Sequence, residues 1–282
     1  MLYSDKGFFF YLMITKRIKI NKDLKMNVFD SSWFKKYETD LTVVFIHGGA
    51  GNLLNWKHQL DYFSEKYRTV AYDWRGCGDS DRVGIYTFEE HYQDFLSLLR
   101  KLNIPVKPIL VGHSYGCLLA RRYISEKPVG KFINVSLGLS SIEERWLKML
   151  LILPKFLQRF LYRSFFLLKN PLFAKKLIAS KKTPLHAIRD SMRANKRPPL
   201  EFFLGLKTFY ENEPLDWIQS YQEKMLIVGG QDDQRFKPNC LEHLNGLLPQ
   251  SKLEIIKDAG HIVPAEAPEN FNNVLEAFIE AK

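Results

Sequence analysis

The chain has 282 residues, of which 46% are hydrophobic and 26% are charged. That composition excludes a disordered or fibrous chain, and the length suits one large α/β domain or a core with an insertion. The formal net charge is +10, and the three cysteines (Cys77, Cys117 and Cys240) form no paired framework or C-x-x-C metal motif, so we expect a reducing, cytoplasmic environment.

The first predicted elements are two strands, Phe8–Ile20 and Lys25–Phe29, joined by a turn at residues 21–23. The apolar run at residues 8–14 is too short to span a bilayer, because a transmembrane helix needs about 20 residues. The Thr-Lys-Arg-Ile-Lys stretch that follows this run also lacks the small residues of a signal-peptide cleavage site. A short N-terminal membrane anchor is the alternative interpretation.

Along the rest of the chain, short apolar runs alternate with amphipathic patterns. The apolar runs predict strands at Thr42–Ile46, Thr69–Tyr72, Ile109–Val111, Phe132–Leu137, Met225–Val228 and Lys252–Ile256. The amphipathic patterns predict helices at Leu53–Lys66, Phe88–Leu102, Tyr115–Ser125, Lys237–Leu247 and Pro268–Ala281. Thr87 precedes the second of these helices as an N-cap, with Glu90 at the capping-box position. Continuous apolar strands separated by helices predict an α/β fold, with a mostly parallel, twisted sheet covered by helices on both faces.

The alternation stops between residues 141 and 221, where the apolar spacing is helical, several prolines occur and no strand pattern is present. We therefore predict a core formed by residues 1–140 and 222–282, with residues 141–221 inserted as a helical cap. Residues 141–215 contain 15 Lys and Arg against 6 Asp and Glu, which accounts for +9 of the total charge of +10. The insertion is therefore expected to be a distinct basic unit on a nearly neutral core.

The pentapeptide Gly-His-Ser-Tyr-Gly at residues 112–116 lies between a predicted strand and a predicted helix. A G-x-S-x-G sequence in that place is typical of a nucleophile elbow, a tight turn that exposes a serine at the carboxyl edge of a sheet. Both glycines are expected because side chains there would lie against neighbouring backbone. The helix that begins at Tyr115 would direct backbone N–H groups toward an anion formed beside Ser114. Ser114 is therefore the predicted nucleophile.

A second glycine-rich turn, His-Gly-Gly-Ala-Gly at residues 47–51, follows the predicted strand Thr42–Ile46. Glycine lets backbone approach a ligand closely, and we expect the N–H of Gly49 to form an oxyanion hole with the N–H of Tyr115. Phosphate binding is the competing interpretation, but the chain has no G-K-[ST] and no G-x-G-x-x-G sequence here. His47 is expected to shape the loop by hydrogen bonding rather than to react.

Two further polar positions follow predicted strands. Gly-Gly-Gln-Asp-Asp at residues 229–233 places two adjacent carboxylates after one strand, and the G-x-x-D spacing favours Asp233 over Asp232 as the group that orients a histidine. His261 lies in the loop after the last predicted strand, from which it can reach over the sheet edge. The chain order Ser, Asp, His, with each residue just past a strand, predicts a catalytic triad of Ser114, Asp233 and His261.

These motifs together resemble those of the α/β-hydrolase fold superfamily, in particular its lipase and esterase branch. The resemblance runs from about Val43 to Phe278, and the segment at residues 141–221 stands where that family carries its variable cap. Residues 73–80, Asp-Trp-Arg-Gly-Cys-Gly-Asp-Ser, are similar to the family's D-x-R-G-x-G-x-S loop after the fourth strand. The resemblance implies Ser114 as nucleophile and His261 as base, with Asp233 as its orienting acid. It also implies a reaction through an acyl-enzyme that needs no metal or organic cofactor.

The predicted cap combines apolar and basic side chains. Its apolar residues are Trp146, Leu147, Leu150, Leu151, Phe156, Leu157, Phe160, Leu161, Phe165 and Phe166, and its basic residues are Arg145, Lys148, Lys155, Arg159, Arg163 and Lys169. This pattern suits a lid that closes on an acyl pocket, and it also suits a helix on an anionic membrane surface. We expect a small hydrophobic acyl substrate in both cases, and peripheral membrane contact in the second. Nucleic acid is not an expected partner, because the basic residues are interleaved with leucine and phenylalanine.

Hydrolysis of carboxylic, lipid-like acyl esters is the favoured function. A proline-iminopeptidase-like activity is the first alternative, which the HGGAG and RGCG sequences favour. However, that group has a G-G-S-x-G elbow and needs acidic groups to recognise a substrate amine. A non-catalytic relative that binds a ligand is the second alternative, and the presence of all three triad residues argues against it. Aspartate at position 114 would have indicated an epoxide hydrolase or a dehalogenase.

Overall fold

The computed structural model describes residues 14–49, 51–139, 152–167, 198–206 and 224–281, together with residues 172, 175, 179–185, 188, 208, 209 and 221. Side chains of the helix at Lys155–Leu167 are described as far as Tyr162.

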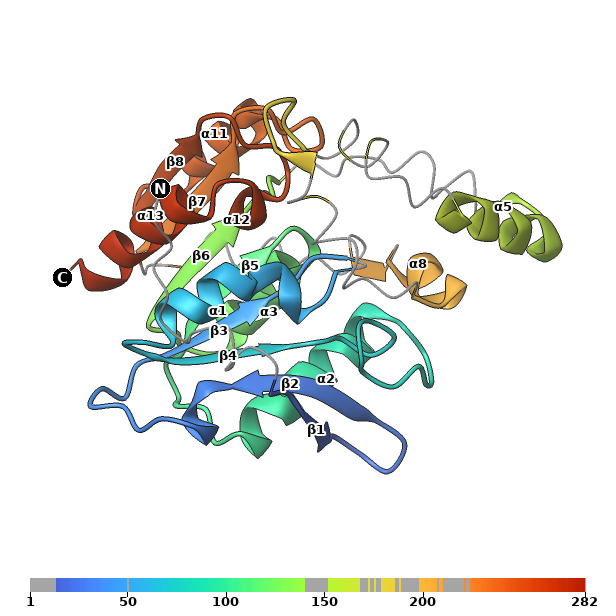
Figure 1. Ribbon diagram of the computed structural model, residues 1–282, viewed down its shortest axis with the longest axis horizontal. Coiled ribbons are helices and arrows are strands. Elements are labelled where there is room, and N and C mark those ends of the chain that lie inside the picture. Colours follow the sequence, from blue (N-terminus) through green and yellow to red (C-terminus); the bar gives the residue numbers. More distant parts are fainter. Residues whose placement is uncertain are drawn as a thin grey trace.

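An eight-stranded sheet runs through the middle of the molecule in the order β1-β2-β4-β3-β5-β6-β7-β8 (Figure 1). The strands are β1 (Lys16–Lys19), β2 (Lys25–Asp30), β3 (Thr42–Ile46), β4 (Arg68–Tyr72), β5 (Ile109–His113), β6 (Lys131–Val135), β7 (Met225–Gly230) and β8 (Ser251–Ile256). The pairs β1–β2 and β2–β4 are antiparallel, and the pairs from β4 to β8 are parallel. The prediction of an α/β fold with a mostly parallel sheet is confirmed.

Both faces of the sheet are apolar, and strand residues alternate between them. In β3, Val43 and Phe45 lie in one buried cluster, whereas Val44 and Ile46 lie in the other. This alternation follows from the two-residue period of a strand. Because neither face meets water, the strand reads as a continuous apolar run in the sequence.

Helices cover each face. The helices α2 (Phe88–Lys101), α3 (Tyr115–Glu126) and α11 (Pro238–Leu247) contribute to one apolar cluster, whereas α1 (Lys57–Phe63), α12 (Val263–Glu266) and α13 (Pro268–Glu280) contribute to the other (Figure 1). The predicted N-cap of α2 is confirmed, since the Thr87 hydroxyl accepts a hydrogen bond from the N–H of Glu90. The Glu90 carboxylate forms an ion pair with Arg75, 2.9 Å away.

Element boundaries differ from the prediction where a local turn interrupts the pattern. The helix expected at Leu53–Lys66 is a 3₁₀ turn, η3 (Leu53–Trp56), followed by the shorter α1, because the backbone of Trp56 (φ −100°, ψ 10°) leaves helical geometry. A second 3₁₀ turn, η2, spans Ser31–Trp33. β6 ends before the predicted Leu137 because Ser136 has a φ of 53°.

Two N-terminal predictions fall largely on residues that the structure leaves out. β1 begins at Lys16, and residues 8–13 of the predicted first strand lie outside the described residues. The alternative of an N-terminal anchor lies there too. Within the part of the chain that the structure describes, no helix is long and apolar enough to cross a bilayer.

The predicted insertion contains helices α5 (Lys155–Leu167) and α8 (Leu200–Gly205), and its described residues form no strand. Figure 1 shows α5 at one end of the molecule, beyond the sheet. The rings of Phe202, on α8, and of Phe209, shortly after it, pack on Trp74, with centroid distances of 6.3 and 5.5 Å. Of the apolar and basic residues predicted for the cap, Trp146, Leu147, Leu150, Leu151, Arg145, Lys148 and Lys169 lie outside the described residues, as do the side chains of Arg163, Phe165 and Phe166.

Candidate active site

Ser114 occupies a tight turn between β5 and α3, where its backbone has a φ of 49° and a ψ of −122°. A Cβ atom at Gly112 would lie 2.8 Å from the Cα of Cys117, and one at Gly116 would lie 2.4 Å from the carbonyl oxygen of Ile46. Only glycine fits at these two positions. The elbow predicted from the sequence is therefore present, and it presents the serine at the carboxyl end of β5.

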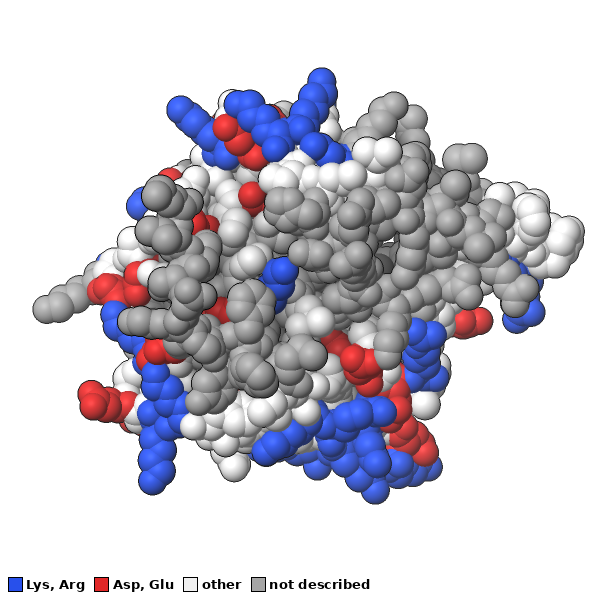
Figure 2. All heavy atoms as spheres, in the orientation of Figure 1, with Lys and Arg blue, Asp and Glu red and all other residues white. Residues whose placement is uncertain are grey.

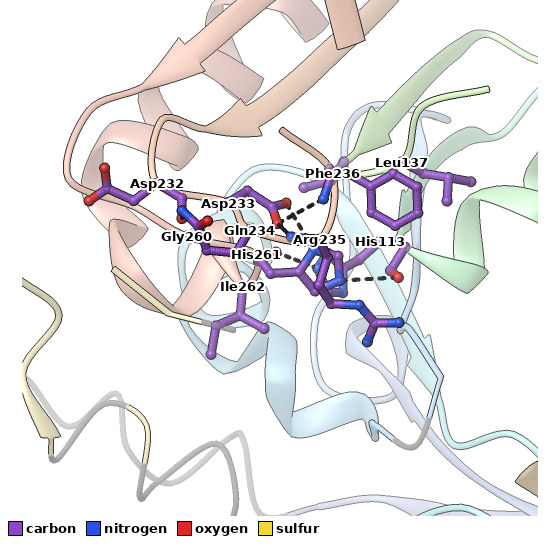
Figure 3. Close-up of polar contacts among 12 residues, drawn as sticks. His113, Leu137, Asp232, Asp233, Gln234, Arg235, Phe236, Gly260, His261 and Ile262 are labelled. Atoms are coloured by element: carbon purple, nitrogen blue, oxygen red, sulfur yellow. Dashed lines mark hydrogen bonds and ion pairs between the residues drawn. The ribbon is translucent and has the colours of Figure 1, made fainter. Parts of the chain in front are cut away.

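A hydrogen-bonded chain runs from this serine to a buried carboxylate. The Nε2 atom of His261 lies 3.2 Å from Ser114 Oγ. Its Nδ1 atom lies 2.9 Å from Asp233 Oδ2, and Figure 3 shows these two side chains facing each other. A carboxylate can only accept, so Nδ1 carries the proton and Nε2 is left to accept from the hydroxyl. All three residues are at most 4% exposed. The structure thus brings together the three side chains that the sequence singled out.

The environment of Asp233 keeps its carboxylate ionised. Burial by itself would raise the pKa of Asp233. The electrostatic interaction and hydrogen bond with His261, together with two backbone N–H groups, outweigh this effect, so the pKa lies below its usual value. Those N–H groups belong to Arg235 and Phe236, and they donate to Asp233 Oδ1 at 2.7 and 3.0 Å. One carboxylate oxygen is thus anchored by backbone while the other faces the imidazole.

The neighbouring Asp232 faces another part of the molecule. Its side chain accepts a hydrogen bond from the hydroxyl of Ser180 in the insertion, and Figure 3 shows it pointing away from His261. Between the two aspartates left open by the sequence, Asp233 is the one that contacts the imidazole. Strand β7 ends at Gly230, and the turn that follows separates the directions of the two side chains.

The glycine turn after β3 lies directly against the elbow. A Cβ atom at Gly48 would lie 3.2 Å from the Cβ of Ser114, and one at Gly49 would lie 2.8 Å from the ring of Tyr115. The backbone of this turn therefore lies in direct contact with the elbow, while its predicted part in an oxyanion hole stays a prediction. Ser114 also stands at the N-terminus of α3, where backbone N–H groups lack intrahelical partners.

The loop after β4 supports that glycine turn. The Nδ1 atom of His47 donates to the carbonyl of Gly48 (2.7 Å), and its Nε2 atom accepts from the N–H of Trp74 (3.2 Å). Burial lowers the pKa of His47 to about 4, so the ring is neutral near pH 7. The buried Asp73 accepts from the N–H of Leu53 at 2.7 Å. The predicted hydrogen-bonding role of His47 is confirmed.

Two residues beside His261 carried no prediction of a role. The Nε2 atom of His113 donates to the backbone carbonyl of His261 at 2.8 Å, and the two rings lie 5.0 Å apart. The pKa of His113 is lowered to about 3, first by burial and then by the nearby His261, so its ring is neutral. The ring of Phe236 stacks on that of His261 at 5.9 Å. His113 directly precedes Ser114 in the elbow, and this adjacency was the sequence feature that could have pointed to a role for His113 in the site.

The described residues contain no group of three or more His, Cys, Asp and Glu side chains arranged to hold a metal ion. Cys77, Cys117 and Cys240, which all lie in the described part of the chain, form no disulfide there.

A family model described as "alpha/beta hydrolase fold" matches residues 42–268. Epoxide hydrolase 3 of Xenopus tropicalis is 26% identical over 270 residues, which are 84% of this chain and 71% of that protein. Proline iminopeptidase of Saccharolobus solfataricus is 24% identical over 302 residues, with 97% of each chain covered.

Solved structures of low sequence identity share the architecture. An esterase from Thermogutta terrifontis superposes with a TM-score of 0.74 at 20% identity, covering 94% of this chain and 97% of that one. A bromoperoxidase from Bacillus anthracis gives the same TM-score at 20% identity, covering 95% and 100%. Since the names of these proteins describe different chemistries, the likeness establishes the fold and leaves the substrate to the residues of the site.

Proposed function

This chain belongs to the α/β-hydrolase fold family, and from that premise we propose that it is a hydrolase that cleaves carboxylic esters with Ser114 as nucleophile. His261 is the proposed base and Asp233 its orienting acid. The observation that carries the proposal is the unbroken path of two hydrogen bonds, 3.2 and 2.9 Å long, from the serine hydroxyl through the imidazole to the carboxylate.

The proposed reaction has two halves. Ser114 Oγ attacks the acyl carbon while its proton passes to His261 Nε2, because a free serine hydroxyl is a poor nucleophile at neutral pH. The tetrahedral oxyanion collapses, the bond to the alcohol breaks, and Nε2 gives its proton to that leaving group. Water, deprotonated by the same nitrogen, then attacks the acyl-enzyme, releases the acid and restores the serine. Asp233 holds the tautomer and stabilises the transient imidazolium.

The backbone N–H groups of Gly49 and Tyr115 are the proposed oxyanion hole. Support comes from the contact between the glycine turn and the elbow, which leaves no room for a side chain at Gly48 or Gly49. Each such donor contributes about 3 kcal/mol to stabilising a tetrahedral transition state.

Two features favour an acyl ester over an epoxide or a peptide as substrate: the serine at position 114 and the basic charge of the predicted insertion. Epoxide opening through an ester intermediate needs a carboxylate nucleophile, and position 114 holds a hydroxyl. Recognition of a substrate amine, as in an aminopeptidase, calls for acidic groups, but residues 145–189 contain 11 Lys and Arg and no Asp or Glu. We therefore place an uncharged acyl ester ahead of a peptide, with residues 141–221 as the cap over the acyl group.

Assays with p-nitrophenyl acyl esters test the proposal. Wild type should hydrolyse them, and Ser114→Ala should lose nearly all of this activity, whereas Ser125→Ala, on the same α3 helix, should retain it. Activity that survives in Ser114→Ala would exclude the serine mechanism. A higher kcat/KM for proline aryl amides than for esters would instead favour the peptidase. Folded protein whose Ser114 resists a fluorophosphonate probe would favour the non-catalytic relative.

We also propose that the insertion meets an anionic lipid surface through α5. Phe156 and Phe160 are 74% and 63% exposed and stand four residues apart in α5, so they lie on one side of the helix. Ile152, just before α5, is 83% exposed. The exposed Lys155 and Arg159 lie beside them. Figure 2 shows uncharged and basic side chains at the end of the molecule where Figure 1 places α5. Apolar side chains flanked by cations suit an interface with anionic headgroups.

Vesicle sedimentation tests this surface. Ser114→Ala protein should bind vesicles that contain phosphatidylglycerol more tightly than pure phosphatidylcholine vesicles. Adding Lys155→Glu and Phe156→Ser should weaken binding by about tenfold, because each basic residue near the surface contributes about 1 kcal/mol. The matched control is Lys107→Glu with Val106→Ser, an equally exposed pair on the core. Equal losses in both double variants, or binding to nucleic acid without binding to vesicles, would exclude α5 as a lipid-facing surface.

A further inference from the structure

The loop that carries His261 is held by a carboxylate outside the triad. Glu266 is the last residue of α12. Its Oε2 atom accepts from the N–H of Gly260, and its Oε1 atom accepts from the N–H of Ile262, each at 3.0 Å. The residues on either side of His261 are therefore both bound to one side chain.

The same carboxylate also holds the insertion. Its Oε2 atom accepts from the N–H of Ser180 at 2.8 Å and from the hydroxyl of Thr183. Both residues are buried, at 0% and 2% exposure. Four donors from two segments about 80 positions apart in the chain thus converge on Glu266.

Neighbouring contacts join the same two segments. The Ser180 hydroxyl donates to Asp232, which lies next to the proposed triad acid. A Cβ atom at Gly260 would lie 2.7 Å from the backbone nitrogen of Ser180, so the backbones touch directly. At the surface, Lys182 forms an ion pair of 2.7 Å with Asp258. We call residues 179–183 the latch segment.

We propose that Glu266 is a positioning residue that couples docking of the latch segment to the placement of His261. The inference rests on the proposed triad. Displacing the latch segment would remove two of the four donors to Glu266 and the backbone that packs against Gly260. The loop could then shift, and the imidazole of His261 would no longer be held at a fixed distance from Ser114. A shift of about 1 Å in a reacting group is enough to lower a rate by about 100-fold. The position of the insertion would in this way control the reactivity of the serine.

The variant Glu266→Gln tests the positioning role. A carboxamide has one acceptor oxygen, and its NH₂ group would face either Ile262 or the other three donors. We expect kcat for a p-nitrophenyl ester, and the rate of fluorophosphonate labelling of Ser114, to fall by at least about tenfold. KM should stay within about twofold, because Glu266 makes no contact with substrate in the proposed reaction. The matched control is Glu276→Gln on α13, whose carboxylate accepts from the Tyr62 hydroxyl, and it should react like wild type.

The variant Thr183→Val tests the coupling to the insertion. It removes one donor from the latch segment and leaves the bonds to Gly260 and Ile262 untouched. It should lower kcat and the labelling rate in the same direction as Glu266→Gln, again with little change in KM. Since this variant nearly preserves side-chain shape, it keeps the test decisive even if Glu266→Gln fails to fold.

The outcomes separate this inference from the proposed function. If wild-type Ser114 does not react with the probe, the triad itself is wrong. If wild type reacts and both variants react at the same rate, Glu266 does not position the base. A slow Glu266→Gln beside a normal Thr183→Val would overturn the coupling to the insertion.

Discussion

Ser114 has a backbone conformation that side chains disfavour, with φ 49° and ψ −122°. Such positions cost of order 1–3 kcal/mol for a non-glycine residue. We expect Ser114→Gly to be more stable than Ser114→Ala by about 1 kcal/mol in denaturant unfolding, because glycine relieves the strain and both variants lose the hydroxyl equally. At Ser125, inside α3, the order should reverse, since glycine disfavours a helix by about 1 kcal/mol. The same order at both positions would show that the elbow is unstrained.

Asp232 and Asp233 are adjacent but have different partners, so the same substitution should have different effects. Asp233→Asn puts an amide against the His261 N–H and should lower kcat by about 1,000-fold or more, with protein of near-wild-type fold. Asp232→Asn still offers an oxygen to Ser180, and kcat should change by less than about tenfold. Steady-state kinetics on one ester decides between them. A larger loss in Asp232→Asn would reassign the acid.

At the scale of elements, aromatic contacts join residues of the predicted insertion to Trp74 in the loop after β4. Phe209 is fully buried and stacks on Trp74 with an interplanar angle of 9°. Phe209→Ala should lower the free energy of unfolding by about 3 kcal/mol or expose the insertion to limited proteolysis, because it removes a buried ring. Phe156→Ala on α5 is the control, since that ring is 74% exposed and its loss should cost little. Equal protease resistance of both variants and wild type would contradict this anchoring role.

At the scale of the whole molecule, buried histidines should make stability depend on pH. Burial lowers the pKa of His47 from 6.5 to about 4. The unfolded chain therefore takes up this proton first as the pH falls, so the stabilisation is complete above pH 6.5 and is lost toward pH 4. His47→Gln should be less stable than wild type near neutral pH.

That variant should also lose less stability between these two pH values, by about 3 kcal/mol. Denaturant unfolding of both proteins measures the difference. Asp61 and Asp73, whose pKa values burial raises to about 6, change stability in the opposite direction. They are present in both proteins and cancel in the comparison. Parallel stability curves for the two proteins would contradict a neutral, buried His47.

The sheet could be predicted from the sequence because its central strands are apolar on both faces, and Thr42–Ile46 was placed with its true ends. The short α12 was missed, since four residues show no periodicity. The break at Trp56 was also missed, because the apolar spacing continues through it while the backbone does not. The hydrophobic pattern of a sequence indicates which side chains are buried, but it does not locate turns of one or two residues or the exact ends of elements.

The sequence by itself determined the α/β class, the elbow at Ser114, the histidine after the last strand and the adjacent pair Asp232 and Asp233, of which it favoured the second. Each of these depends on a pattern within a few neighbouring residues. Only the tertiary structure decided that Asp233 rather than Asp232 contacts the imidazole, and that Glu266 and His113 hold its loop. The contacts of Asp233, Asp232 and His113 join residues 28, 52 and 148 positions apart, which no local pattern encodes. The contact between Glu266 and Ile262 spans four positions, but it depends on the side-chain direction in a turn.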